Sequence, residues 1–449
     1  MDQSVISRAV SVAGGRFAPG HLGELTQQVP FEMVDAVLEE TCRTQRRVRA
    51  LPSRVVVYLL LAGCLFAELG YTQVWHRVAA GLGGLPVAVP TASAMTQARR
   101  RLGPAPLREL FFLLRGPAPG GARWRGLLVC AIDGTIMTVA DSEANLAVYS
   151  RQRGGKNGPS GYPMLRLLVL VSCGTRTVID AVFSPVSKGE TTCAPALLAS
   201  LHAGMILLAD RNFGAGLLAA QIAGTRAGFL IRVRSGNCSP KLPVLSRCGD
   251  GSWLSRFGGI PVRVIDAEIT VTTSTGHATS GCRLITTLLD PARYPAPEIA
   301  VLYRERWEVE SAYFELKSTI LGGRVLRART PGGIDQEVYA LLVTYQVLRT
   351  AIADAAGTVP GTDPDRASFT VALNAARDQV ILAAGILAGP AADLAGTIGR
   401  LVLASLMPGR RLRISPRVVK RAMSRYNARG KADRATRKAT IAITILDVP

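Results

Sequence analysis

The sequence predicts a mixed α/β protein in which an α/β core is interrupted by antiparallel β structure and flanked by helical regions. Three observations lead to this prediction. Residues 1–120 follow helical patterns, residues 126–209 alternate strand-like and helix-like segments, and residues 230–290 are Thr- and Val-rich between Gly, Ser and Pro turns. The 449 residues suit two or three domains, and 48% of them are hydrophobic, which suits a sizeable core.

The charge balance narrows the partners of the chain. Lys and Arg total 53 against 32 Asp and Glu, a formal net charge of +21. So basic a protein usually binds a polyanion, and DNA, RNA and anionic membrane are the candidates. The apolar run at residues 55–67 is shorter than the roughly 20 residues of a membrane span, no amphipathic anchor stands out, and the start lacks a signal-peptide pattern. We therefore expect a nucleic-acid partner, no membrane and a cytoplasmic location.

Cysteine and histidine usage limits the possible metal chemistry. The eight cysteines are scattered singly, and none of the four histidines has metal-ligand spacing. This argues against a zinc site and a disulfide framework and favours the reducing cytoplasm. Any metal site must then be built from oxygen ligands.

The first 120 residues are predicted to form a basic helical domain. An apolar helix covers residues 55–69, and a second helix follows Pro90, with Thr91 or Ser93 as its cap. The second helix carries Arg99 and Arg100, which are the candidate DNA contacts of this region. The alternative is a helical bundle whose Arg-rich face is merely solvated.

An α/β core is predicted from the order of its elements. Strand-like runs at residues 126–140, 165–173 and 177–185 precede a helix at 191–202 and a strand at 205–208. Three strands, a helix and a further strand form the opening of a ribonuclease-H-like fold. We assign this core to residues 121–229 and 291–350, a β insertion to residues 230–290, and a helical basic C-terminal region to residues 351–449. The tail at residues 410–438 is either a phosphate-binding helix or a frayed basic end.

Two acids stand out by their positions at the ends of hydrophobic strands. Asp133 lies in the segment CAIDGT, and Asp210 ends the segment LLADRN. If the two strands are neighbours, both carboxylates project from one sheet edge and can share a divalent ion. Each acid alone is equally well explained as a turn or helix-cap residue, but two such acids in one core are costly unless coordinated or hydrogen-bonded.

A third acid lies on a helix with an unusual face. At 100° per residue, Tyr303, Arg306, Glu310 and Lys317 fall within about 60° of one another. The face thus combines an aromatic hydroxyl, a guanidinium, a carboxylate and an ammonium group. A surface helix with an Arg306–Glu310 ion pair is the simpler alternative, but it does not account for Tyr303 and Lys317.

These four residues match the signature Y-(2)-R-(3)-E-(6)-K at every spacing, and in this the sequence resembles the IS4 family of DDE transposases. The resemblance extends to the segments around Asp133 and Asp210, to the loop and helix that carry Glu190, and to residues 31–112, which look like the family's helical N-terminal domain. The last ~100 residues are the least distinctive. A β insertion between the second Asp and the Glu is also typical of the family.

The resemblance implies the activity and the partners. In such enzymes the two Asp and the Glu bind two Mg²⁺ ions, for which Mn²⁺ substitutes, and a dimer assembled on double-stranded DNA cuts the transposon ends through a hairpin and joins the 3′ hydroxyl to target DNA. Asp133, Asp210 and Glu310 are then the catalytic metal ligands, and Tyr303, Arg306 and Lys317 hold phosphates near the cut. The protein is expected to be bacterial and nucleoid-associated.

The remaining predictions concern the positions of two tryptophans and two alternative functions. Trp253, in the insertion, is a candidate for stacking on a flipped base, with a buried core position as the alternative. Trp307 is assigned to the core. The rival functions are a catalytically silent DNA-binding descendant of a transposase and a nuclease that does not join strands.

Overall fold

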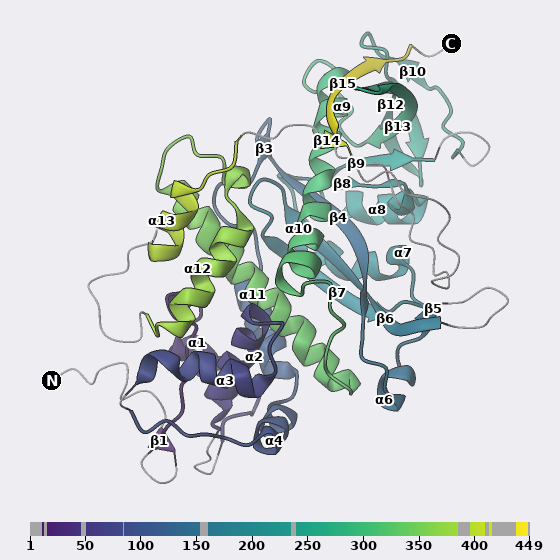
Figure 1. Cartoon of the computed structure of the whole chain (residues 1–449). Helices are drawn as coiled ribbons and strands as arrows, with labels where there is room; N and C mark the ends of the chain where they lie inside the picture. Colours follow the sequence, from purple (N-terminus) through teal and green to yellow (C-terminus); the bar gives the residue numbers. More distant parts are fainter. Residues whose placement is uncertain are drawn as a thin grey trace.

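The computed structural model of the chain describes residues 11–12, 16–45, 51–83, 85–152, 160–234, 239–384, 396–408, 413–414 and 437–447 (Figure 1). Most of the basic tail at residues 410–438 therefore lies outside the described residues. Within them, no helix is both long and apolar enough to cross a membrane.

The N-terminal region is helical, as predicted. Its helices are α1 (Phe31–Glu40), α2 (Ser53–Leu65), α3 (Tyr71–Ala79), α4 (Ala92–Leu102) and α5 (Ala105–Leu114), preceded by a short pairing of β1 (Ser11–Val12) with β2 (Arg16–Phe17). Helix α4 begins at the predicted cap, because the Thr91 hydroxyl accepts a hydrogen bond from the Ala94 N–H at 3.1 Å. Helix α2 is buried on all sides, which its uninterrupted apolar sequence requires.

A mixed sheet forms the centre of the molecule. Strands β4 (Leu127–Thr138), β6 (Ser160–Ser172) and β7 (Val178–Pro185) are antiparallel neighbours in the order β7-β6-β4. On the other side of β4, strands β8 (Met205–Ala209) and β9 (Gly228–Val233) run parallel to it and to each other. This order, with the first three strands antiparallel and the fourth and fifth parallel to the first, is the predicted ribonuclease-H-like arrangement.

Alternate residues of β4 face two separate hydrophobic clusters. Val129 and Ala131 point to the side covered by α10 (Trp307–Phe314), α11 (Pro331–Gly357) and the N-terminal helices. Cys130 and Ile132 point to the side covered by α7 (Glu190–Cys193), the 3₁₀ helix η3 (Ala194–Ser200) and α8 (Gly216–Gly224). The helix predicted at residues 191–202 is thus a short α-helix followed by a 3₁₀ segment, which begins next to Pro195, a residue without an N–H to donate.

The β insertion extends this same sheet. Strands β10 (Ser246–Arg247), β11 (Trp253–Phe257), β12 (Ile260–Thr273) and β13 (Gly276–Thr286) are antiparallel, and β13 pairs with β9 of the core. The predicted insertion at residues 230–290 is therefore continuous with the core sheet. The smaller elements are β3 (Arg123–Trp124), α6 (Glu143–Leu146), β5 (Arg151–Gln152), and the 3₁₀ turns η1 (Leu25–Gln27), η2 (Ala80–Leu82) and η4 (Arg211–Phe213).

The C-terminal region is only partly helical, which corrects the prediction. Helix α12 (Phe369–Ile381) and helix α13 (Gly396–Ala404) follow α11 and the turn η8 (Pro364–Arg366). The chain then returns to the insertion, where β15 (Arg437–Ile445) pairs with β12 and with β14 (Arg413–Ile414) (Figure 1). The alternating exposure of β15 and its Thr and Ile residues are typical of a strand with one covered face.

Candidate active site

The two candidate aspartates lie at the same level of two neighbouring strands. Strands β4 and β8 are parallel and pair Ala131 with Leu208, and each aspartate follows two residues later. Asp133 is within β4, where its Oδ1 accepts a hydrogen bond from the Gly134 N–H at 2.8 Å. Asp210 directly follows β8 and accepts from the Asn212 N–H at 2.8 Å, as a cap of η4. Strand alternation directs both aspartates to the face that α10 covers.

Glu310 approaches this edge from α10, which lies across the sheet beside β4 and β6 (Figure 1). Arg306 lies between two of the candidate acids: its Nη2 donates to Glu310 Oε1 at 3.0 Å, and its Nη1 is 3.6 Å from Asp133 Oδ2. The Arg306 guanidinium therefore contacts Glu310 on its own helical segment and Asp133 on β4, and the second contact links the helix to the strand. The Arg306–Glu310 pair expected by the simpler alternative is present, with an Arg306 side chain that is 11% exposed and a Glu310 side chain that is 39% exposed.

The electrostatics of the three acids are coupled. Burial is the largest cause that raises the pKa of Asp133 to about 6, and the negative charges of Asp210 and Glu310 raise it further. The Gly134 N–H and the Arg306 guanidinium act in the opposite direction. A carboxylate that is destabilised by burial and by two like charges is favoured by a bound cation.

The other two residues of the helix face also contact the sheet. The Tyr303 hydroxyl donates to the carbonyl oxygen of Ala209 at 3.3 Å, directly before Asp210, and burial raises the pKa of this tyrosine. Lys317 Nζ donates to Thr135 Oγ1 on β4 at 3.0 Å, and burial lowers the pKa of the ammonium group. The structure thus brings all four predicted residues of the face next to the aspartates, of which Asp133 lies inside β4 and Asp210 directly follows β8.

The helix that carries this face is not one continuous α-helix. After α9 (Ala296–Leu302), Tyr303–Arg306 form the 3₁₀ turn η6, α10 follows, and Glu315–Ile320 form a π-helix, η7. A π turn holds one residue more than an α turn and is frequent at functional sites. The prediction assumed a uniform α-helix with 100° per residue, whereas the segment contains 3₁₀, α and π turns. The four residues nevertheless lie on one face.

Tyr313 is a residue of the site that the sequence analysis missed. Its hydroxyl donates to the carbonyl oxygen of Asp133 at 2.5 Å, lies 3.2 Å from that of Leu167, and accepts from the Val169 N–H at 3.1 Å. It fixes α10 to β4 and β6 directly at the first aspartate. Its position three residues after Glu310, on the same helix face, was the available signal.

Other predicted contacts lie elsewhere or have different surroundings. Trp253 is buried in β11 with 3% of its surface exposed, which supports its core alternative because a buried ring offers no face to a base. The prediction for Trp307 is wrong: it is 58% exposed at the start of α10, with the Arg306 guanidinium 5.2 Å from its ring. On α4, Arg100 is exposed, whereas the half-buried Arg99 guanidinium is 4.2 Å from the Tyr71 ring.

The donor set suits a hard divalent cation. The candidate ligands are all carboxylates, which match the oxygen preference of Mg²⁺ and Mn²⁺. Burial, and to a smaller extent the charges of Asp210 and Glu310, raise the pKa of Asp133. In the part of the chain that the structure describes, no three His, Cys, Asp or Glu side chains converge closely enough to hold a metal ion. Arg306 instead provides the positive charge between Asp133 and Glu310.

Comparison with known proteins identifies the family of this chain. Residues 19–112 match the family model described as insertion element 4 transposase N-terminal, and residues 124–347 match the transposase DDE domain. The chain belongs to the IS4 family of DDE transposases. It is thus a transposase of an insertion sequence, from an enzyme family that cleaves DNA and transfers strands and that typically uses divalent metal ions.

Two curated relatives and one solved structure resemble this transposase. The transposase InsG for insertion sequence element IS4 of Escherichia coli (strain K12) is 27% identical over 411 residues, which cover 88% of this chain and 91% of InsG. The putative transposase InsZ of the same organism is 28% identical over 195 residues, covering 42% of this chain and 62% of InsZ. A cryo-EM structure of a piggyBac transposase synaptic complex with hairpin DNA aligns with a TM-score of 0.44 and 10% identity over 84% of each chain.

Proposed function

We propose that this transposase cuts the ends of its insertion sequence and joins the freed 3′ hydroxyl to target DNA, with Asp133, Asp210 and Glu310 as its metal-binding carboxylates. The observation that carries the proposal is the placement of two aspartates at one level of the parallel strands β4 and β8, facing the helix of Glu310. Two Mg²⁺ ions, or Mn²⁺ in their place, would supply activation of the attacking oxygen and stabilisation of the leaving 3′ oxygen in an in-line phosphoryl transfer.

The cationic residues of the site have a separate role in this proposal. Arg306 is buried against both Asp133 and Glu310, so its planar guanidinium is held at the strand edge where a scissile phosphate must approach. Lys317 is anchored on β4 by Thr135 and provides a second positive charge on the same helix face. Both groups would favour the negative charge that accumulates on the phosphate during transfer.

The proposed partner is double-stranded DNA, held by a homodimer that brings two transposon ends together. The net charge of +21 supports the polyanion, and the family resemblance is the support for the dimer. Exposed Arg100 on α4 belongs to the proposed end-binding surface. A bacterial nucleoid is the corresponding location.

The proposal is tested by cleavage and strand transfer on DNA that carries the element's own ends, with Mg²⁺ or Mn²⁺. Asp133→Ala, Asp210→Ala and Glu310→Ala are expected to bind the ends but to lose both cutting and joining. The matched control is Glu298→Ala, which removes an exposed carboxylate paired with Arg125 on the surface. Its rates should equal those of the wild type.

Each rival function predicts a different result. A wild-type protein that binds the ends but does not cut them is a silent DNA-binding descendant. Cutting without joining, even when a 3′-hydroxyl end is supplied, identifies a nuclease. Cutting that persists in all three alanine variants would refute the assignment of the acids.

A further inference from the structure

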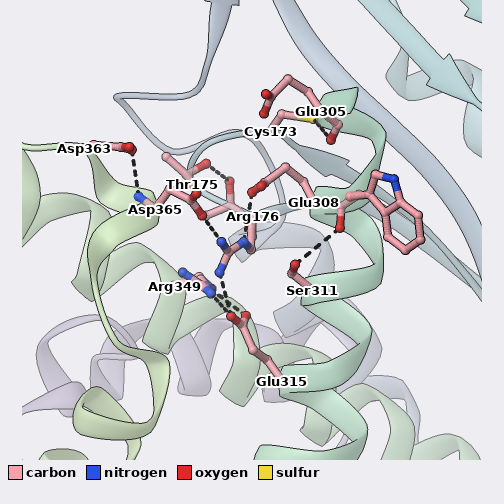
Figure 2. A network of polar contacts seen from close by, with 12 residues as sticks. Cys173, Thr175, Arg176, Glu305, Glu308, Ser311, Glu315, Arg349, Asp363 and Asp365 are labelled. Carbon is pink, nitrogen blue, oxygen red and sulfur yellow. Dashed lines mark hydrogen bonds and ion pairs between the residues drawn. The ribbon is translucent and has the colours of Figure 1, made fainter. Parts of the chain in front are cut away.

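A cluster of charged side chains lies beside α10 (Figure 2), the helix that also carries Glu310. It consists of two arginines and three acids, whose side chains are between 0% and 9% exposed, and we call it the Arg176 network: Arg176, Glu308, Glu315, Arg349 and Asp365. None of these residues belongs to the signature that the sequence analysis singled out. The burial of five charged side chains in one cluster calls for a role other than stabilising the fold. The cost of removing charges from water can equal what their ion pairs contribute.

Glu315 is at the centre of the contacts between helices. Its Oε1 accepts from Arg176 Nη1 at 2.8 Å and from Arg349 Nη2. Its Oε2 accepts from Arg349 Nε at 2.9 Å and from the Tyr345 hydroxyl at 3.1 Å. Both carboxylate oxygens are therefore held by two donors each, which fixes the side chain in rotation as well as in position.

Arg176 connects the same helix to two further elements. Its Nε donates to Glu308 Oε2 at 2.9 Å, and its Nη2 pairs with Asp365 of η8. The residue lies in the turn between β6 and β7 at a φ of 57°, a conformation that costs energy for a side chain larger than glycine. The Tyr345 hydroxyl, whose single proton is within reach of Glu315 Oε2, also lies 3.0 Å from the Arg176 carbonyl oxygen. The network thus joins the core sheet, α10, α11 and η8.

The network holds the opposite side of the helix from the candidate active site. Glu308 and Glu310 are two residues apart on α10, so their side chains are about 200° apart around the helix axis. Glu308 contacts Arg176 on the buried side, while Glu310 contacts Arg306 on the side of β4. A fixed Glu308 therefore sets the rotation of the helix at which Glu310 faces Asp133.

Glu315 also marks the change from α to π geometry. It is the first residue of η7, in which the Leu321 N–H donates to the Leu316 carbonyl oxygen five residues back, at 3.2 Å. Short π segments are rare, so one that persists needs support from its surroundings. Two residues into this segment, Lys317 reaches Thr135 on β4. The four hydrogen bonds to Glu315 are the support at the point where the π segment begins.

We propose that the Arg176 network positions α10 and the π segment against β4, and that Arg176, Glu315 and Arg349 are positioning residues for DNA cleavage. The inference rests on the proposed function of Glu310 and Lys317. A fixed ionic network suits this task better than apolar packing, because charge-assisted hydrogen bonds define both direction and distance. Misplacing a reacting group by about 1 Å can lower a rate by roughly 100-fold.

The test uses the full-length protein with two variants and a matched control. Glu315→Gln removes the charge that both arginines share. Glu315→Gln/Arg349→Met also removes one arginine, so that fewer buried charges lack a partner and the fold is retained if the single variant is unstable. The control, Glu298→Gln, makes the same substitution in the exposed Arg125 pair. Cooperative thermal unfolding establishes that each variant is folded.

Three measurements separate positioning from general structural damage. Binding of transposon ends without metal should be unchanged, the cleavage rate at saturating DNA should fall by roughly 10- to 100-fold, and amide hydrogen exchange should become faster in residues 307–320 but not in β4. A folded double variant with wild-type cleavage and wild-type exchange would overturn the inference. If the wild type itself does not cleave, the proposed function fails, and the exchange of residues 307–320 still decides whether the network holds this helix.

Discussion

Replacing Asp133 by asparagine is expected to stabilise the metal-free protein at neutral pH while it removes cleavage. Burial, helped by the charges of Asp210 and Glu310, raises the pKa of Asp133 from 3.8 to about 6, even though the Gly134 N–H and Arg306 favour the carboxylate. The folded protein thus prefers the neutral acid more strongly than the unfolded chain does. At pH 7 Asp133 is mostly ionised in the folded protein, in surroundings that favour its neutral form. This lowers the free energy of unfolding.

The size of the effect follows from the two pKa values. Below pH 3.8 the carboxyl group of Asp133 is protonated in both states and costs nothing. Between pH 3.8 and about 6 the unfolded chain loses its proton first, so the free energy of unfolding falls as pH rises. At about 1.36 kcal/mol per pH unit, the total loss above pH 6 is about 3 kcal/mol. Asparagine keeps an oxygen for the Gly134 N–H and carries no charge.

The assay is thermal unfolding in the presence of a chelator at pH 5 and pH 8. A gain of about 3 kcal/mol corresponds to a Tm roughly 3 °C higher at pH 8 for a chain of 449 residues, and the gain should be about half as large at pH 5, where Asp133 is only partly ionised in the folded protein. Asp141→Asn, which removes an exposed carboxylate paired with Arg151, controls for the substitution itself. An equal gain at both pH values, or a lower Tm of Asp133→Asn at pH 8, would refute the reasoning.

Two further predictions concern other buried groups. In Gly134→Ala, the new Cβ would lie 2.5 Å from Glu190 Oε1 and would break the 2.7 Å pair of Glu190 with Arg166. We expect a loss of about 1–3 kcal/mol in thermal unfolding, recovered when Glu190→Ala is added. Burial lowers the pKa of His21 to about 4 although its bond to the Val78 carbonyl raises it, so stability present above pH 6.5 is lost as pH falls towards 4. In urea unfolding, the wild type should lose about 2 kcal/mol more than His21→Gln between pH 7 and pH 5, and equal losses would contradict this.

The sequence by itself determined the succession of the core strands along the chain and the start of α4 after Pro90, and it predicted the residues of the candidate site. Local patterns carry this information, because a buried strand needs continuous apolar residues and a helix face repeats with its turn. The spacing of Tyr303, Arg306, Glu310 and Lys317 therefore predicted a common face even though the segment contains 3₁₀ and π turns.

The tertiary structure alone decided which surroundings each side chain has. The strand at Arg437–Ile445 finds its partner β12 more than 160 residues earlier in the chain, and no local pattern specifies that pairing. Trp307 is apolar but exposed, whereas Arg349 is charged but fully buried, because burial depends on which distant elements pack around a residue. The same reason explains why the Arg176 network escaped the sequence analysis: its five charges lie on α10, η7, α11, η8 and the turn between β6 and β7, which only the folded chain brings together.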